Sequence, residues 1–335
     1  MLLAIQPLGF HWQTLDPFLF CAFHNDAFPR GNGELGPAAA LSGRNLGMDF
    51  ELRDGWRMYH GERVPGFPAH PHRGFETIPV VRQGLVDHAD SLGAAGRYGE
   101  GDVQWMTAGR GVQHSEMFPL VHEDRANPLL LFQIWLNLPA RNKLVDPHFT
   151  MFWAADIPVL SSRDTEGGQT TVTVIAGSHG GITALQPPPD SWAAERANTV
   201  AIWLVELEPG ARWQLPAVAD GTNRMLYFYD GSSLVIDGHE LVVQHGARVD
   251  EQFMSLHNTS LVPARLLLLQ GKPIREPVAQ HGPFVMNSRE QLIQAFSDYQ
   301  RDHFGGWPWP RADQVHGGRG RFARHADGRE DEPSR

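Results

Sequence analysis

Short apolar runs separated by glycine and proline turns dominate the chain. The strongest run of the first half is Leu129–Leu136 (LLLFQIWL), and Leu261–Gln270 (LVPARLLLLQ) mirrors it in the second half. Runs of this length, bounded by Gly, Pro, Asn and Asp, are typical of β-strands joined by tight turns. Helical periodicity is convincing only over Ser288–Gln300, where Ser288 is a good N-cap. The pattern predicts an all-β protein with one short helix near its C-terminus.

The two halves repeat the same order of strands and turns. Repetition of this kind predicts two small antiparallel barrels in tandem, built from one duplicated design. The boundary is expected near Leu138–Pro147, a polar bridge that contains prolines. It gives a first domain over residues 1–140 and a second over residues 141–302, which ends in the helix. Residues 303–335 form a tail rich in Gly, Arg, Asp and Glu, and from about Gly317 its composition predicts disorder.

Composition narrows the class of protein. The 335 residues suit two domains, and the net charge of −10 argues against direct binding of nucleic acid, whose phosphates are also negative. The single cysteine, Cys21, allows no internal disulfide. Since the N-terminal residues also lack the basic region of a secretory signal, a reducing cytoplasm is expected. No apolar run approaches the ~20 residues that span a bilayer, so no membrane association is expected.

Two pairs of potential metal ligands stand out in the first half. His70 and His72 are two residues apart, and His114 and Glu116 repeat this spacing about forty residues later. Residues i and i+2 of a strand point to the same face, so two such pairs on neighbouring strands of a barrel would converge on one interior point. Three imidazoles and one carboxylate suit a first-row divalent metal and leave positions open for water, oxygen or substrate. With only one cysteine, a structural site closed by thiolates is excluded.

Glu76 shares the face of His70 and His72 if the strand stays regular. It could be a ligand, a partner that holds an imidazole, or one half of an ion pair with a nearby arginine, and we favour the second role. Most of the 17 histidines of the chain are expected to lie at the surface or to form ordinary hydrogen bonds. Where the first half has His-Pro-His, the second half reads Pro216–Ala219 (PAVA), so its barrel is expected to hold no metal.

A family resemblance joins these motifs. The stretches FPAHPHRGFETI (Phe67–Ile78), DHADSLG (Asp87–Gly93) and GDVQWMTAGRGVQHSEM (Gly101–Met117) resemble the pirin family of tandem cupin barrels, as do WLNLP (Trp135–Pro139) and EPVAQHGPFVMN (Glu276–Asn287). The resemblance implies two jelly-roll barrels of cupin type and one divalent ion, Fe(II), bound by His70, His72, His114 and Glu116. It favours Glu116 over Glu76 as the fourth ligand. The spacing of the glycines around His70 departs from the general cupin signature, a departure that pirins share.

The resemblance also implies two alternative functions. The first is a dioxygenase of quercetin 2,3-dioxygenase type, in which a small aromatic flavonol and O2 react at the metal and Glu116 acts as the general base. The second is a metal-containing, redox-responsive regulatory protein that binds a protein partner, as a transcriptional cofactor or a regulator of an enzyme, without catalysis of its own. A metal that only stabilises the fold is the third and least favoured interpretation, because open His/Glu sites are typical of reactive ions.

Overall fold

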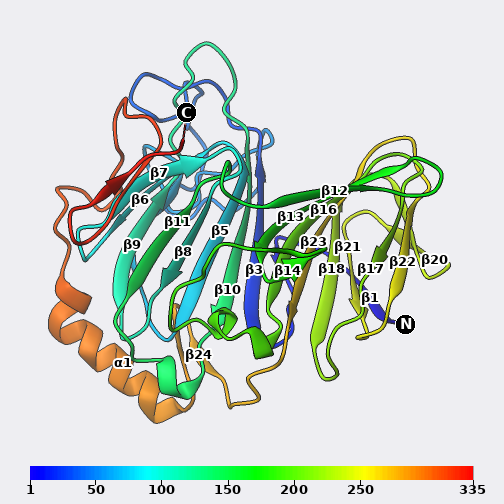
Figure 1. The fold of residues 1–335 in the computed structure, drawn as a ribbon. Coiled ribbons are helices and arrows are strands. Elements are labelled where there is room, and N and C mark those ends of the chain that lie inside the picture. The colour runs from blue at the N-terminus through cyan, green and yellow to red at the C-terminus, as the bar shows by residue number, and fades with distance from the viewer. Residues whose placement is uncertain (335) are drawn as a thin grey trace. The chain divides into compact units, whose positions relative to one another are not determined.

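Each of the two units of the structure is built from two separate segments of the chain (Figure 1). The structure is a computed structural model that describes residues 1–334. The first unit consists of residues 1–21 and 156–275, and the second consists of residues 22–155 together with the chain from Glu276 onward.

The second unit contains the predicted ligands and is built on two antiparallel sheets. One sheet has the order β11-β8-β5-β10-β3, and the other has the order β27-β26-β7-β6-β9-β4. A small hairpin, β24-β25, precedes the only α-helix among the described residues. The strands are β3 (Phe18–Asp26), β4 (Gly66–His72), β5 (Phe75–Gln83), β6 (Leu85–Asp90), β7 (Ala95–Gly99), β8 (Val103–Thr107), β9 (Val112–Met117), β10 (Leu129–Asn137), β11 (His148–Phe152), β24 (Ala279–His281), β25 (Phe284–Met286), β26 (Phe322–Arg324) and β27 (Glu330–Asp331).

The inner faces of these two sheets meet through side chains of both. The ring of His88 on β6 stacks on Phe149 of β11, with 5.4 Å between the ring centroids. Gln133 on β10 donates a hydrogen bond to Glu116 on β9. The ligand strands β4 and β9 therefore present one face to the interior of a barrel, as the alternation of side chains requires.

The first unit is a second antiparallel β-structure with its own apolar core. Its sheets have the orders β1-β21-β18-β23-β16-β13-β12 and β17-β22-β19-β20, with a small hairpin β14-β15. Leucines of LVPARLLLLQ and residues such as Trp203, Phe228 and Leu256 are buried together in the core. The strands are β1 (Leu2–Pro7), β2 (His11–Trp12), β12 (Val159–Arg163), β13 (Gln169–Ala176), β14 (Ser178–His179), β15 (Ile182–Thr183), β16 (Ala201–Leu207), β17 (Arg212–Leu215), β18 (Asn223–Asp230), β19 (Ser233–Ile236), β20 (His239–Val242), β21 (His245–Val249), β22 (Met254–Asn258) and β23 (Ala264–Gly271).

The helix α1 spans Arg289–Asp302 and begins where the sequence predicts. The side chain of Ser288 accepts a hydrogen bond from the backbone N–H of Gln291, which satisfies one of the free donors of the first turn. Four short 3-10 turns complete the secondary structure of the described residues: Ala140–Asn142, Trp192–Ala194, Arg196–Asn198 and His303–Gly305. None of the helices in residues 1–334 has the length and apolar character needed to cross a bilayer.

The structure divides the chain differently from the expected boundary at residue 140. Strand β11 lies beyond that boundary but pairs with β8 of the second unit. Strand β1 comes first in the chain but pairs with β21, with Pro7 opposite His245. Strand pairing between segments far apart in sequence thus sets the division, and a local change in composition does not reveal it.

The tail also departs from the expectation of disorder. Strand β26 extends the sheet by pairing with β7, and Phe322 is buried. The guanidinium of Arg321 donates to both carboxylate oxygens of Asp102, each 3.0 Å away. The composition of this segment predicts a run of solvated charges, but the segment has specific partners within the second unit.

Candidate metal centre

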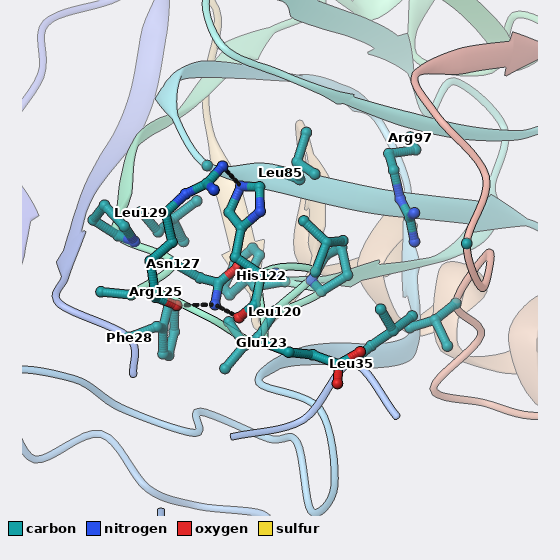
Figure 2. A pocket seen from close by; sticks show the side chains of 18 of the residues that line it. Phe28, Leu35, Leu85, Arg97, Leu120, His122, Glu123, Arg125, Asn127 and Leu129 are labelled. Atoms are coloured by element: carbon teal, nitrogen blue, oxygen red, sulfur yellow. Dashed lines mark hydrogen bonds between the residues drawn. The ribbon is translucent and has the colours of Figure 1, made fainter. Parts of the chain in front are cut away.

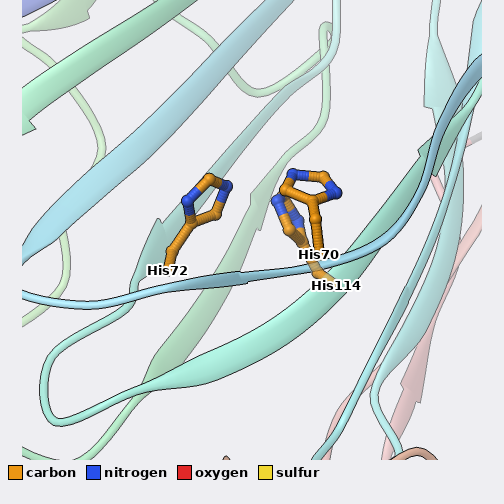
Figure 3. Close-up of side chains that lie close together, drawn as sticks. All are labelled: His70, His72 and His114. Carbon is orange, nitrogen blue, oxygen red and sulfur yellow. The ribbon is translucent and has the colours of Figure 1, made fainter. Parts of the chain in front are cut away.

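Three histidines of the second unit converge from neighbouring strands (Figure 3). His70 and His72 lie on β4, and His114 lies on β9 directly opposite His70 in the antiparallel ladder. One nitrogen from each ring lies within 4.8 Å of those of the other two. Among residues 1–334, this is the only group of three His, Cys, Asp or Glu side chains brought so close together. The alternation of side chains along the two strands brings these three of the four predicted ligands together.

The three imidazoles are neutral and have ring nitrogens available to bind a metal ion. Nδ1 of His70 lies 2.9 Å from the carbonyl oxygen of Pro68, which fixes the proton on Nδ1 and leaves Nε2 free. Nδ1 of His72 and both ring nitrogens of His114 are buried without a hydrogen-bond partner among the described residues. Burial lowers the pKa of His70 to about 4 and lowers the pKa values of His72 and His114 well below the usual value. Neutral imidazoles with free lone pairs fit a divalent metal ion.

Glu116 lies beside the cluster on the same face of β9 as His114. Its Oε2 is 3.8 Å from Nε2 of His114 and accepts a hydrogen bond of 2.8 Å from Nε2 of Gln133. Burial raises the pKa of this carboxyl to about 7, against the hydrogen bond from Gln133, which lowers it. Gln133 is a partner that the sequence analysis missed, although a single polar residue within LLLFQIWL was the signal for it.

Glu76 does not join the cluster, because the strand that begins at Gly66 ends at His72. The turn at Arg73 and Gly74 separates β4 from β5, and Gly74 has a φ of +85° that favours glycine. Glu76 therefore belongs to β5, where it accepts a hydrogen bond of 2.6 Å from Oγ1 of Thr107. The face that Glu76 would share with the histidines exists only in an uninterrupted strand.

His88 is a neighbour of the cluster that the sequence analysis did not single out. It lies on β6 opposite Glu116, and its fully buried ring is 5.5 Å from the ring of His114, centroid to centroid. Its Nε2 is 3.2 Å from Oδ2 of Asp90. The H-x-D spacing was visible in DHADSLG, but only the pairing of β6 with β9 shows that this face meets the metal ligands.

A large pocket of the second unit lies apart from these residues. Its volume is about 1150 Å³, and its walls include residues 118–123, 125–129 and 317–321. Figure 2 shows Arg125 and Asn127 in one wall, where they donate hydrogen bonds to Nε2 and to the carbonyl oxygen of His122. Neither the three histidines nor Glu116 line this pocket, so it is separate from the candidate metal centre.

Comparisons with known proteins show the family that the chain resembles. The family model described as Pirin matches residues 9–136, and the model described as Pirin C-terminal cupin domain matches residues 202–305. A Pseudomonas aeruginosa protein named "Putative quercetin 2,3-dioxygenase" is 42% identical over 241 residues, which cover 71% of this chain and 79% of that protein. Human pirin is 34% identical over 248 residues, covering 72% of this chain and 79% of that protein.

A solved structure extends the likeness to the whole fold. The crystal structure of a quercetin 2,3-dioxygenase from Acinetobacter baumannii superposes with a TM-score of 0.71 at 25% identity, covering 91% of this chain and 98% of that one. The prediction of an all-β protein with two cupin domains and one short C-terminal helix is thereby confirmed. The chain belongs to the pirin family.

Proposed function

We propose that this protein is a metal-dependent dioxygenase of quercetin 2,3-dioxygenase type. The observation that carries the proposal is the convergence of three neutral imidazoles, two of them buried and one partly buried, beside a buried carboxylate. In this proposal His70, His72, His114 and Glu116 bind one divalent ion, Fe(II), and the substrate is a small flavonol-like aromatic that reacts with O2. The names of the Pseudomonas and Acinetobacter relatives support the same reaction class.

The side chains of this centre would have three different roles. A bound divalent ion would supply Lewis-acid charge and redox chemistry next to the substrate. His70, His72 and His114 would hold the ion through their free ring nitrogens. Glu116 would accept the proton of the flavonol hydroxyl as the general base. Gln133 keeps the carboxylate in place by its hydrogen bond to Oε2.

Flavonol turnover tests the proposal directly. The protein is loaded with Fe(II) under nitrogen, quercetin and oxygen are added, and the loss of flavonol absorbance is followed together with release of carbon monoxide. We expect turnover by the loaded protein and none by the metal-free protein. Glu116→Gln is expected to retain the shape of the site but to lose most of the rate, on the order of 100-fold or more, because a general base contributes about that much.

The outcome that contradicts the proposal is inactivity despite a filled site. Protein containing one equivalent of Fe, Mn, Co, Ni or Cu, each verified by elemental analysis, would then consume neither quercetin nor oxygen. Elemental analysis of protein purified without added metal identifies the native ion in the same experiment.

One observation favours a regulatory function as the second candidate. The first unit exposes large apolar side chains, with Leu261 94% and Phe253 65% accessible to solvent. A redox change of the metal would alter the affinity of the protein for a partner protein in this alternative. Pull-down from cell extract with oxidised and reduced protein tests it, and identical results in the two states would reject it.

A further inference from the structure

The C-terminal segment contacts a residue beside each of the three histidines. This segment, residues 298–316, comprises the end of α1 and the chain that follows it. We call it the C-terminal clamp. It touches Gln113 next to His114, Arg73 next to His72, and Ala69 next to His70. Because neighbouring residues of a strand point to opposite faces, contacts at Gln113 leave the inner face of β9 to His114.

Gln113 is held by three hydrogen bonds. Its Nε2 donates to the carbonyl oxygens of His303 (2.7 Å) and Gly306 (3.0 Å), and its Oε1 accepts from the hydroxyl of Tyr299 at 3.0 Å. The side chain is buried, and all of these partners belong to the clamp. This amide fixes β9 at the residue that precedes His114.

Arg73 is held at the end of the other ligand strand. Its Nη1 donates to Oδ2 of Asp298 at 2.8 Å, and its guanidinium carbon lies 4.6 Å from the centre of the Phe304 ring. Only 9% of the Arg73 side chain is accessible, so the pair is shielded from solvent screening. The clamp thereby restrains the chain directly after His72.

The third contact lies at a gap in the hydrogen-bond ladder between β4 and β9. The register shifts between Phe67 and His70, and such a bulge leaves residues without a partner across the ladder. The backbone N–H of Ala69 donates instead to the carbonyl oxygen of Ala312 at 2.9 Å. Ala312 lies beyond residue 305, where the match to the C-terminal family model ends.

The same stretch restrains the strand that carries His88. The indole N–H of Trp309 donates to the carbonyl oxygen of Asp90 at 2.8 Å. Nε2 of His316 lies 2.8 Å from the carbonyl oxygen of His88. The clamp therefore reaches three adjacent strands, β4, β9 and β6, at residues beside the metal cluster.

We propose that the C-terminal clamp positions the three histidines from outside the barrel and that Gln113 is a positioning residue for His114. The inference rests on the proposed metal centre but not on the reaction proposed for it. Groups that orient metal ligands without touching the ion typically change metal affinity by about 10- to 100-fold when they are lost. The affinity for a metal ion and the spectrum of the bound ion therefore measure the clamp directly.

The test compares two buried glutamines, each changed to a methionine of similar length. Gln113→Met removes the three hydrogen bonds of the clamp, whereas Gln270→Met changes an equally buried glutamine in the other unit that donates to Thr199. Co(II) affinity is measured in full-length protein by competition with a chelator, together with the visible absorption of the bound ion. We expect Gln113→Met to weaken Co(II) binding about 10- to 100-fold and to shift the absorption bands. Gln270→Met should leave both unchanged.

Equal Co(II) affinities and spectra in the two folded variants would overturn the proposal. If Gln113→Met does not fold, Tyr299→Phe removes a single hydrogen bond to Gln113 from a partly exposed side chain, and an unchanged affinity and spectrum in that variant would overturn it as well. If the wild-type protein binds no Co(II), the metal centre itself fails. The clamp is then tested by hydrogen exchange at Ala69 and at Ser91, whose backbone N–H donates to the carbonyl oxygen of Gln113 at 2.8 Å. Both amides should lose protection in Gln113→Met and not in Gln270→Met.

Discussion

Replacing His114 with alanine is expected to lower the affinity for a divalent metal by more than about 100-fold, because a lost ligand costs more than a lost outer partner. His114 is fully buried, and neither ring nitrogen has a hydrogen-bond partner among the described residues. The metal-free protein therefore loses no hydrogen bond with this ring, and any change in its stability comes from the cavity that the ring leaves. Chelator competition and thermal unfolding of the metal-free protein measure the two effects separately.

A histidine of the other unit provides the control. His179 is half-buried and packs with its ring 4.8 Å from the ring of Trp203, and among residues 1–334 it belongs to no group of potential metal ligands. His179→Ala should leave metal affinity unchanged. Metal binding by His114→Ala as tight as that of His179→Ala would show that the cluster is not the metal centre.

Replacing Arg97 with methionine is expected to lower the free energy of unfolding by about 3–5 kcal/mol, because it leaves the buried carboxylate of Asp87 without its charged partner. The guanidinium of Arg97 forms two parallel hydrogen bonds with Asp87, at 2.6 and 2.7 Å. It also donates to the carbonyl oxygens of Gly317 and Arg319 in the tail. Both charged side chains are almost completely buried. Denaturant unfolding of the metal-free protein measures the loss.

Substitution of an exposed arginine separates the effect of burial from the effect of charge pairing. Arg265 pairs with Glu206 and Asp230, and all three side chains are more than a third accessible. Arg265→Met should cost at most about 1 kcal/mol, since exposed ion pairs contribute little. A similar small loss in Arg97→Met would contradict the expectation. The double variant Asp87→Leu/Arg97→Met should be more stable than Arg97→Met, because it removes the unpaired charge as well.

The ligand pairs could be predicted from the sequence because strand periodicity acts between near neighbours. The spacing of His70 with His72, and of His114 with Glu116, fixes which side chains share a face. The rule failed at Glu76, where the glycine turn at Gly74 starts a new strand. A turn of this kind changes the face of every later residue.

Partners from distant strands could not be predicted in the same way. The sequence shows that His88 and Asp90 share a face, but only the register of β6 against β9 brings that face to His114. The tail illustrates the same limit, since composition counts its charges without showing that Arg321 pairs with Asp102. Pairing between distant segments depends on three-dimensional packing, which a local sequence pattern does not show.

The division of the chain has a consequence for its synthesis on the ribosome. Residues 22–155 hold all four proposed ligands, yet the clamp and β26 belong to the same unit and follow only after residues 156–275. At ~5–20 residues per second, that interval lasts on the order of ten seconds. The nascent chain therefore emerges with its ligand strands complete in sequence but without the outer support of the sheet. Tight capture of the metal is expected to wait until the clamp and β26 have left the exit tunnel.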